Sequence, residues 1–550
     1  MLFSPLVLLA LGLYASRANC NYVQTRPCEN TVSNSGTHYS LSAFYQPEGH
    51  GDNILRLEVI EEGADIACDA ASANSTTLLA LHSLGHHWEV EDQGPATCRT
   101  WNSRMGTREE SLVYPITSNL GPVSALSTFD FRLELESNVS PGARVCLQGE
   151  FTPAMADTTS KALTWVPRAL LILMLLVGVF RGIDERSVHM NGPASHASTD
   201  LSLPGVGDFL GYLQFVFLSG SLSLHYPGFF QPVASKLNLF SLFLRGPFNH
   251  GVVYQSAADG IYSINGTFGG TTGLEHMHQI VGAPKTADTW LNMVVAILVV
   301  SCAAALFLEL VSSCMRCFRD RSPTRSHPGS IGIVPRLLAV LRLVLSYFTL
   351  PLSALSFYQL SAAEFLPAYN TASATLLIIS TILAFVWLFR RMPPQRAGLL
   401  IFDTPKWYQK QYGHTAQPGD PRAEKMFVTT IVVMTFVRGA AIGGLQISGP
   451  VQLSILAASE LFFLILIRWL RIYPIFSMGT FAPAVRLAAT LLMIFFVRGA
   501  SSLSARSAVG YAILSLHALM VVLGFIVPAI YNFSKICFRM FQDRVSFAAG

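Results

Sequence analysis

The sequence predicts a membrane protein of two parts: an all-β sandwich near the N-terminus, followed by a polytopic all-α transmembrane domain of about nine helices. The 550-residue chain is 51% hydrophobic and only 13% charged, whereas soluble domains are about 25% charged. Apolar runs of roughly 20 residues, the length that crosses a bilayer, recur after residue 160. Residues 21–160 contain no such run and alternate like strands instead.

The first 18 residues are expected to be a cleaved secretory signal. A short apolar stretch precedes the small-x-small sequence Ser16-Arg17-Ala18, which is typical of signal cleavage sites. Cleavage there would place the next segment in the lumen of the secretory pathway or outside the cell. The chain then divides into a signal peptide at 1–18, a luminal domain at 19–160 and a transmembrane domain at 161–545.

Alternating residues predict the strands of the luminal domain. Residues 129–136 read FDFRLELE, so every second side chain would face a core and the charged ones would face water. The sequence around Leu55, Leu57 and Val59 repeats this pattern. Several such strands, separated by turns rich in Gly, Ser, Asn and Pro, predict a β-sandwich.

Cysteines and glycosylation sequences agree with a luminal location. The segment contains an even set of four cysteines: Cys28, Cys68, Cys98 and Cys146. We expect two disulfides, and the sequence leaves all three pairings open. Three N-x-S/T acceptor sites fall in segments expected to be luminal: Asn74, Asn138 and Asn265.

Nine membrane spans are expected from the apolar runs. They lie at about 164–182, 206–225, 288–312, 334–358, 373–390, 426–445, 450–469, 481–502 and 508–531. The loops at 361–372 and 446–449 have no Lys or Arg, whereas the loops of the opposite side are rich in both. This positive-inside distribution predicts a luminal or extracellular N-terminus and a cytosolic C-terminus.

The five residues FVRGA occur twice, at 436–440 and at 496–500. Each copy closes an apolar run, and the two runs are expected to cross the membrane in the same direction. A duplicated helix pair would explain this recurrence, and chance in a biased composition is the alternative. Arg438 and Arg498 would lie toward the luminal ends, either snorkelling to the headgroups or facing inward along a transport path.

Two more ionisable residues lie inside expected spans. Glu460 is near the middle of 450–469, and His517 is at a similar depth in 508–531. A buried carboxylate must be paired, protonated or wet, and Arg438 or Arg498 can reach Glu460 if their helices are neighbours. The transport-path candidates are therefore Arg438, Glu460, Arg498 and His517.

The sequence carries no enzyme signature. It has no Walker loop, no HExxH and no supported GxSxG motif. The Glu275–His278 stretch, EHMH, offers two histidines without further ligands, so we expect surface residues and no metal site. No cofactor is expected, and the absence of a long basic tract argues against a nucleic-acid partner.

Residues 207–215, GDFLGYLQF, and 220–227, GSLSLHYP, resemble a recurrent stretch of the fungal TRP-like membrane proteins. That family includes flavin carriers and polycystin-like channels. The order of parts in this chain is similar over nearly its full length. The resemblance implies that the luminal sandwich is an ML-like domain, a class similar to lipid-recognition domains.

The resemblance implies two functions, and a third is weighed beside them. The first is a TRP-like cation channel, calcium-permeable and linked to cell-wall integrity, in the plasma membrane or a secretory-pathway membrane. The second is transport of FAD into the lumen of the endoplasmic reticulum. The third is a lipid-binding membrane scaffold that transports nothing. Expected partners are membrane lipids and the transported cation or FAD, with homo-oligomerisation left open.

Overall fold

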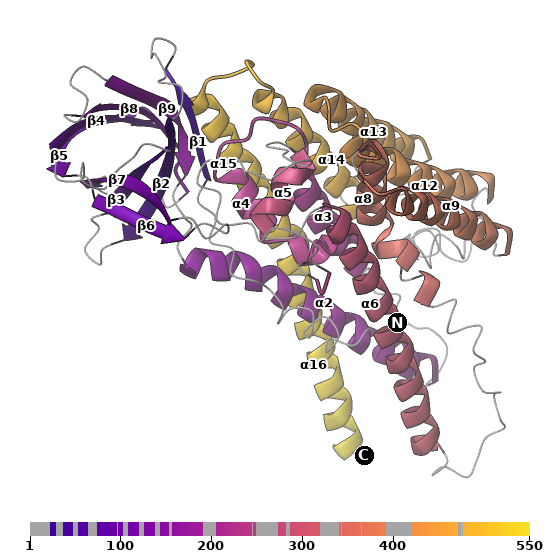
Figure 1. Cartoon of the computed structure of the whole chain (residues 1–550). Coiled ribbons are helices and arrows are strands. Elements are labelled where there is room, and N and C mark those ends of the chain that lie inside the picture. Colours follow the sequence, from indigo (N-terminus) through magenta and orange to yellow (C-terminus); the bar gives the residue numbers. More distant parts are fainter. Residues whose placement is uncertain are drawn as a thin grey trace.

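The computed structural model describes most of the β-rich and helical parts of the chain (Figure 1). The described residues are 22–28, 37–47, 53–63, 74–95, 97–102, 108–119, 126–137, 144–152, 157–190, 205–244, 246–248, 273–281, 286–319, 340–342, 344–364, 366–391, 421–470, 473, 475 and 477–549. The expected signal at 1–18, together with Cys68, Asn138 and Asn265, lies outside them.

The N-terminal part is a β-sandwich of two antiparallel sheets. One sheet has the strand order β1-β9-β8-β4-β5 and the other has the order β2-β3-β7-β6. The strands are β1 (Tyr22–Pro27), β2 (Thr37–Pro47), β3 (Asn53–Gly63), β4 (Asn74–Ser83), β5 (His86–Pro95), β6 (Thr97–Asn102), β7 (Arg108–Asn119), β8 (Phe129–Ser137) and β9 (Arg144–Thr152).

The sandwich core confirms the alternation that predicted it. Leu55 and Val59 of β3 and Phe129 of β8 are fully buried and belong to one cluster drawn from both sheets. The stacked rings of Phe129 and Phe151 lie 5.1 Å apart between centroids. Inward-facing side chains of two facing sheets are what stabilises such a fold.

A disulfide links the end of β1 to the neighbouring strand β9, which is one of the pairings that the sequence left open. Cys28 is bonded to Cys146, with their Cα atoms 5.4 Å apart. Cys98 is disulfide-bonded as well. The bond closes a loop that covers most of the domain, which stabilises the fold chiefly by restricting the unfolded chain.

The rest of the described chain is helical. Its elements are α2 (Asp157–Met190), α3 (Val206–Ser219), α4 (Phe230–Ser235), η2 (Asn238–Ser241), α5 (Gly273–Val281), α6 (Thr286–Arg319), α8 (Thr349–Ser361), α9 (Ala368–Arg391), α12 (Pro421–Gly444), α13 (Gly449–Leu470), α14 (Met478–Leu492), η4 (Met493–Phe496), α15 (Leu503–Leu519), η5 (Met520–Ile526) and α16 (Val527–Ala549).

Seven helices of the described residues are long and apolar enough to cross a membrane, or eight if one bent pair counts as a span. Their large exposed apolar side chains, such as Leu383 on α9 and Leu523 on η5, suit contact with lipid. The expected span at 481–502 is shorter than predicted, because its helix stops at Phe496. The expected span at 508–531 is longer, because α15, η5 and the first part of α16 form one apolar stretch from Leu503 to Phe538.

The expected span at 206–225 needs correction. Helix α3 has 14 residues, too few to cross a bilayer as a helix. The segment still runs beside α14 from end to end: Asp208 shares a pocket with Met478, and the His225 amide donates to the Phe496 carbonyl at 2.8 Å. A short helix continued by irregular chain therefore takes the place of a full helical span.

The expected span at 334–358 is bent by 67° between Val340–Tyr347 and Thr349–Ser361. Pro351 lacks the N–H that would bond the Tyr347 carbonyl in a continuous helix. The Gln214 amide donates to that carbonyl at 2.7 Å instead. A side chain of α3 thus satisfies the backbone acceptor that the proline leaves open.

Small residues join α8 to α12. Gly439 and Gly443 are one turn apart on α12, and an added Cβ at Gly443 would lie 1.8 Å from the Ala354 carbonyl oxygen. Glycines at this spacing let two helix backbones approach closely in membranes. This contact fixes α12 beside α8.

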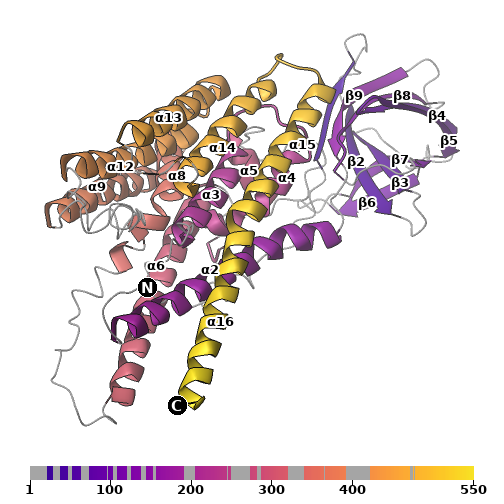
Figure 2. The same cartoon turned by 180° about the vertical axis from the view of Figure 1, so that it is seen from behind.

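The sandwich lies at one end of the helical part, beside the start of α15, and the end of α16 points away from it (Figure 2). The α14–α15 turn is therefore on the sandwich side, and the α13–α14 connection is at the opposite end of α14. These two ends are called the sandwich end and the distal end below.

Candidate functional site

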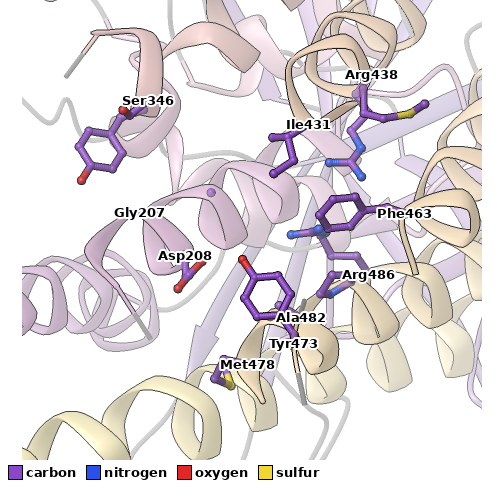
Figure 3. A pocket seen from close by; sticks show the side chains of 15 residues that line it. Gly207, Asp208, Ser346, Ile431, Arg438, Phe463, Tyr473, Met478, Ala482 and Arg486 are labelled. Carbon is purple, nitrogen blue, oxygen red and sulfur yellow. The ribbon is translucent and has the colours of Figure 1, made fainter. Parts of the chain in front are cut away.

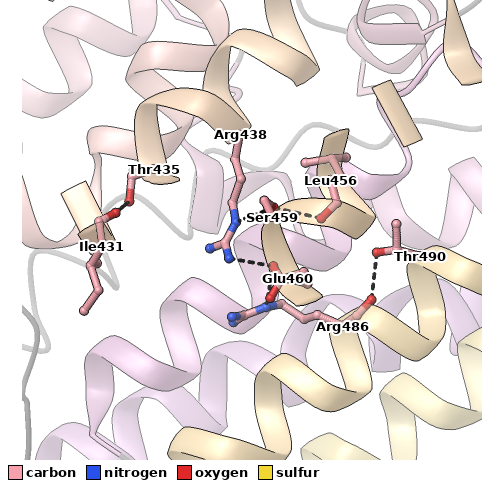
Figure 4. Close-up of polar contacts among 8 residues, drawn as sticks. All are labelled: Ile431, Thr435, Arg438, Leu456, Ser459, Glu460, Arg486 and Thr490. Atoms are coloured by element: carbon pink, nitrogen blue, oxygen red, sulfur yellow. Dashed lines mark hydrogen bonds and ion pairs between the residues drawn. The ribbon is translucent and has the colours of Figure 1, made fainter. Parts of the chain in front are cut away.

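Three charged side chains from three consecutive helices meet inside the bundle (Figure 4). Glu460 Oε1 on α13 lies 3.1 Å from Arg438 Nη2 on α12 and 3.1 Å from Arg486 Nε on α14. Glu460 is 1% exposed. Arg438, Glu460 and Arg486 are called the ionic triad below.

Each helix places its residue well inside the apolar region. Arg438 follows 13 residues of the candidate span that begins at Lys425, and Glu460 lies midway along Gly449–Leu470. Arg486 is eight residues beyond the start of α14. Charges at such depth are costly unless they are paired or wet, so the three helices are held together by a contact that lipid cannot replace.

Neighbouring groups orient the two guanidinium groups. Arg438 Nε donates to Ser459 Oγ at 3.2 Å, and that hydroxyl donates to the Leu456 carbonyl at 2.8 Å. The Arg438 guanidinium lies 5.7 Å from the Phe463 ring centroid, and that of Arg486 lies 5.9 Å from the Phe215 ring. Aromatic faces attract cations at these distances.

A cavity of about 190 Å³ borders the triad (Figure 3). Both arginines line its inner part, while Asp208, Tyr473 and Met478 line it at the distal end of the helices. One water molecule needs only roughly 10–15 Å³ of such space. The cavity can therefore hold several waters or part of a solute beside the two guanidinium groups.

The charges around this cavity are unevenly placed. In the ionic triad one carboxylate faces two guanidinium groups. Arg438 and Arg486 both pair with the same oxygen of Glu460. Within the described part of the chain, the terminal nitrogens of Arg486 make no hydrogen bond. The inner part is therefore electropositive, and the Asp208 carboxylate is negative at the distal end.

His517 lies near the triad without touching it. Its Nδ1 lies 2.9 Å from the Tyr212 hydroxyl of α3, and its ring contacts Phe215, the ring under Arg486. The π-helix η5 begins three residues later. Such irregular turns inside long helices are frequent at functional sites.

Arg498 is placed apart from the other three candidates. It is exposed in the turn after η4, whereas Arg438 is inside α12. The two FVRGA copies therefore do not occupy equivalent positions, contrary to what the duplicated helix pair would require.

Sequence reasoning missed Arg486, although the sequence held a signal for it. An ionisable residue inside an apolar run is a functional candidate by default, and Arg486 lies inside the expected span at 481–502. Pairing of Glu460 with Arg438 or with Arg498 was one of the alternatives. In the structure its partners are Arg438 and Arg486.

The EHMH stretch is buried, which corrects its expected surface location. His276 and His278 of α5 are 4% and 0% exposed. Burial lowers the pKa of His276 to about 4 and that of His278 to about 3, because a dry environment disfavours the charged form. Among the residues that the structure describes, no group of three or more His, Cys, Asp or Glu could hold a metal ion.

Together, the fold and the site define a multi-pass membrane protein with a charged cluster inside its helical part. A family model described as Transient receptor potential (TRP) ion channel matches residues 255–548, more than half of the chain. The chain therefore belongs to this ion-channel family, as the resemblance predicted. Neither the search of curated proteins nor that of solved structures found a match.

The matched region contains the ionic triad and His517, but it begins after the sandwich. The ML-like nature of the sandwich therefore stays a prediction. The family is one of channels and not of enzymes.

Proposed function

We propose that this protein is a calcium-permeable cation channel in the plasma membrane or a secretory-pathway membrane, with the sandwich facing the lumen or exterior. The ionic triad beside the cavity is the observation that carries the proposal. Ionisable residues inside a membrane that face a cavity mark substrate or ion pathways among other functional sites. The TRP match over the same helices supports this choice.

In this proposal the triad holds the path closed. The electropositive inner part opposes cations, and Glu460 is neutralised by its two partners. Movement of α12 or α14 away from α13 would separate an arginine from Glu460 and expose the carboxylate to the path. Asp208 would make the distal mouth of the path attractive to cations.

Transport of FAD is the second candidate, and a specific observation favours it. Arginine guanidinium groups match phosphate oxygens in geometry and charge, and both arginines line the cavity. The same donors that oppose a cation would bind the diphosphate of FAD. A lipid-binding scaffold without transport is the third candidate.

Paired flux in proteoliposomes separates the three candidates. Calcium entry and FAD entry are measured with the same purified preparation, under membrane tension and under voltage. The proposal expects calcium flux without FAD flux. FAD flux without calcium flux would make the protein a carrier. If a folded preparation shows neither flux, the lipid-binding scaffold is the remaining candidate.

The membrane sidedness is proposed from the positive-inside distribution and from the acceptor sites Asn74, Asn138 and Asn265. Treatment with a glycosidase should lower the apparent mass of the protein on a gel if the sandwich is luminal. Replacement of the three asparagines by glutamine should remove that shift.

A further inference from the structure

A second charged cluster joins the sandwich to the helical part. Arg506, near the start of α15, donates from Nη2 to Glu150 Oε1 on β9 at 2.7 Å. Its other terminal nitrogen, Nη1, contacts His225 Nδ1 in the segment between α3 and α4. Arg506 is 8% exposed. Glu150, His225 and Arg506 are called the joint below.

Contacts around the joint connect the sandwich to α15 and to the end of η4. The Tyr511 hydroxyl of α15 donates to the Leu126 carbonyl at 2.8 Å, and the Tyr511 ring stacks on Phe229 at 4.3 Å. The His225 amide donates to the Phe496 carbonyl, where η4 ends. A change at the joint would therefore act on the sandwich, α15 and the end of η4 together.

The contact between His225 and Arg506 requires a neutral imidazole. An arginine side chain can only donate hydrogen bonds, so His225 Nδ1 must accept. Protonation of His225 would remove this acceptor and place a second cation beside Arg506. The joint would then hold two cations against one carboxylate.

We propose that the joint is an acid-sensitive contact that releases the sandwich from α15 when the compartment on the sandwich side is acidified. Histidine is the side chain that changes charge in this range, with an ordinary pKa near roughly 6.5. Among the described residues, the charged groups at His225 and its partners include Arg506 on α15 and Glu150 on β9. Asp130 on β8 lies opposite Glu150 in the strand register. Carboxylates ordinarily titrate near roughly 4, below the range in which histidine gains its proton.

This inference rests on the proposed function only for its consequence, which is regulation of the channel by luminal or external pH. The structural part is tested without any flux measurement. Hydrogen exchange of residues 503–512 is measured on the full chain in lipid nanodiscs at about pH 7.5 and about pH 5.5, with labelling times scaled to the intrinsic pH dependence of amide exchange.

Wild-type protein should exchange these amides roughly tenfold faster at the lower pH, since one linked proton changes an opening equilibrium by up to about tenfold per pH unit. His225→Asn keeps an acceptor near the position of Nδ1 and cannot titrate, so its exchange should not depend on pH. His87→Asn is the matched control, because His87 is exposed on β5 and pairs with Glu89. That control should keep the wild-type response.

Glu150→Gln provides an independent variant. It removes the carboxylate that offsets Arg506, so residues 503–512 should exchange rapidly at both pH values. A wild-type pH response in His225→Asn or in Glu150→Gln would overturn the proposal, and so would a pH-independent wild type. If the exchange response is present but no cation flux is found, the joint stands and the proposed channel function fails.

Discussion

The two copies of FVRGA share five residues and differ in structure. The first copy lies within α12, where Arg438 pairs with Glu460 and an added Cβ at Gly439 would lie 2.1 Å from Ser353 Oγ. In the second copy the helix has ended at Phe496, Arg498 is exposed, and Gly499 has a positive φ of 80° with no atom within 4 Å of its Cβ position.

The difference teaches that contacts far along the chain decide what these five residues become. Helix α12 continues through the first copy because α8 packs closely against its glycines and α13 supplies Glu460. At the second copy, the His225 amide binds the Phe496 carbonyl, which a continuing helix would need for its own bond. Glycine then permits the left-handed turn that leads to α15.

The largest expected effect comes from removing the carboxylate of the triad. Glu460→Gln leaves two guanidinium groups inside the bundle without an anion, which should cost about 3–5 kcal/mol of unfolding free energy. Thermal unfolding in detergent micelles measures this loss, with Arg498→Ala as the reference. An unfolding temperature equal to that of wild type would show that the arginines are hydrated without Glu460.

Close helix packing provides the next test. Gly443→Ala would push a methyl group against the Ala354 carbonyl and should cost about 1–3 kcal/mol, as overpacking does. Gly444→Ala is the matched control, because its Cβ would meet only Phe357 at 3.8 Å. Equal stability of the two variants would contradict the close contact of α8 with α12.

Much of the fold could be predicted from local patterns. Strict alternation identified the β8 strand, and apolar runs located the seven long helices, because burial against a sheet and contact with lipid both impose a simple periodicity. The bend near Tyr347 could not be predicted in the same way. It depends on Pro351 and on the amide of Gln214, which is more than a hundred residues away.

The site was predictable only in part. Arg438 and Glu460 are single charges within apolar runs, so each one is visible in the sequence. Their geometry depends on which helices are neighbours, and no local pattern shows that α14 brings Arg486 to the same carboxylate oxygen. Arg498 had the same local sequence as Arg438 but lacked those neighbours.

A smaller effect is expected at Gly499, the glycine of the second FVRGA copy. Gly499→Ala should cost about 1 kcal/mol, because an L residue is strained at positive φ. Gly499→Asn should cost less, since asparagine tolerates this conformation and the space around the site is open. Denaturant unfolding of both variants checks this order. A larger loss of unfolding free energy for Gly499→Asn than for Gly499→Ala would contradict backbone strain at positive φ as the cause.

The smallest effect is expected for Arg498 itself. Arg498→Ala should change the unfolding free energy by no more than about 0.5 kcal/mol, as exposed substitutions usually do. A loss comparable to that of Glu460→Gln would mean that Arg498 has a structural partner, and the distinction between the two FVRGA arginines would fail.

The most direct test of the central claim is cation flux per folded molecule in proteoliposomes, compared among wild type, Arg438→Ala and Arg498→Ala. The proposed channel predicts altered calcium flux for Arg438→Ala, because the triad loses one of its two cations, and wild-type flux for Arg498→Ala. Equal flux per folded molecule in all three proteins would contradict a role for the triad in the path.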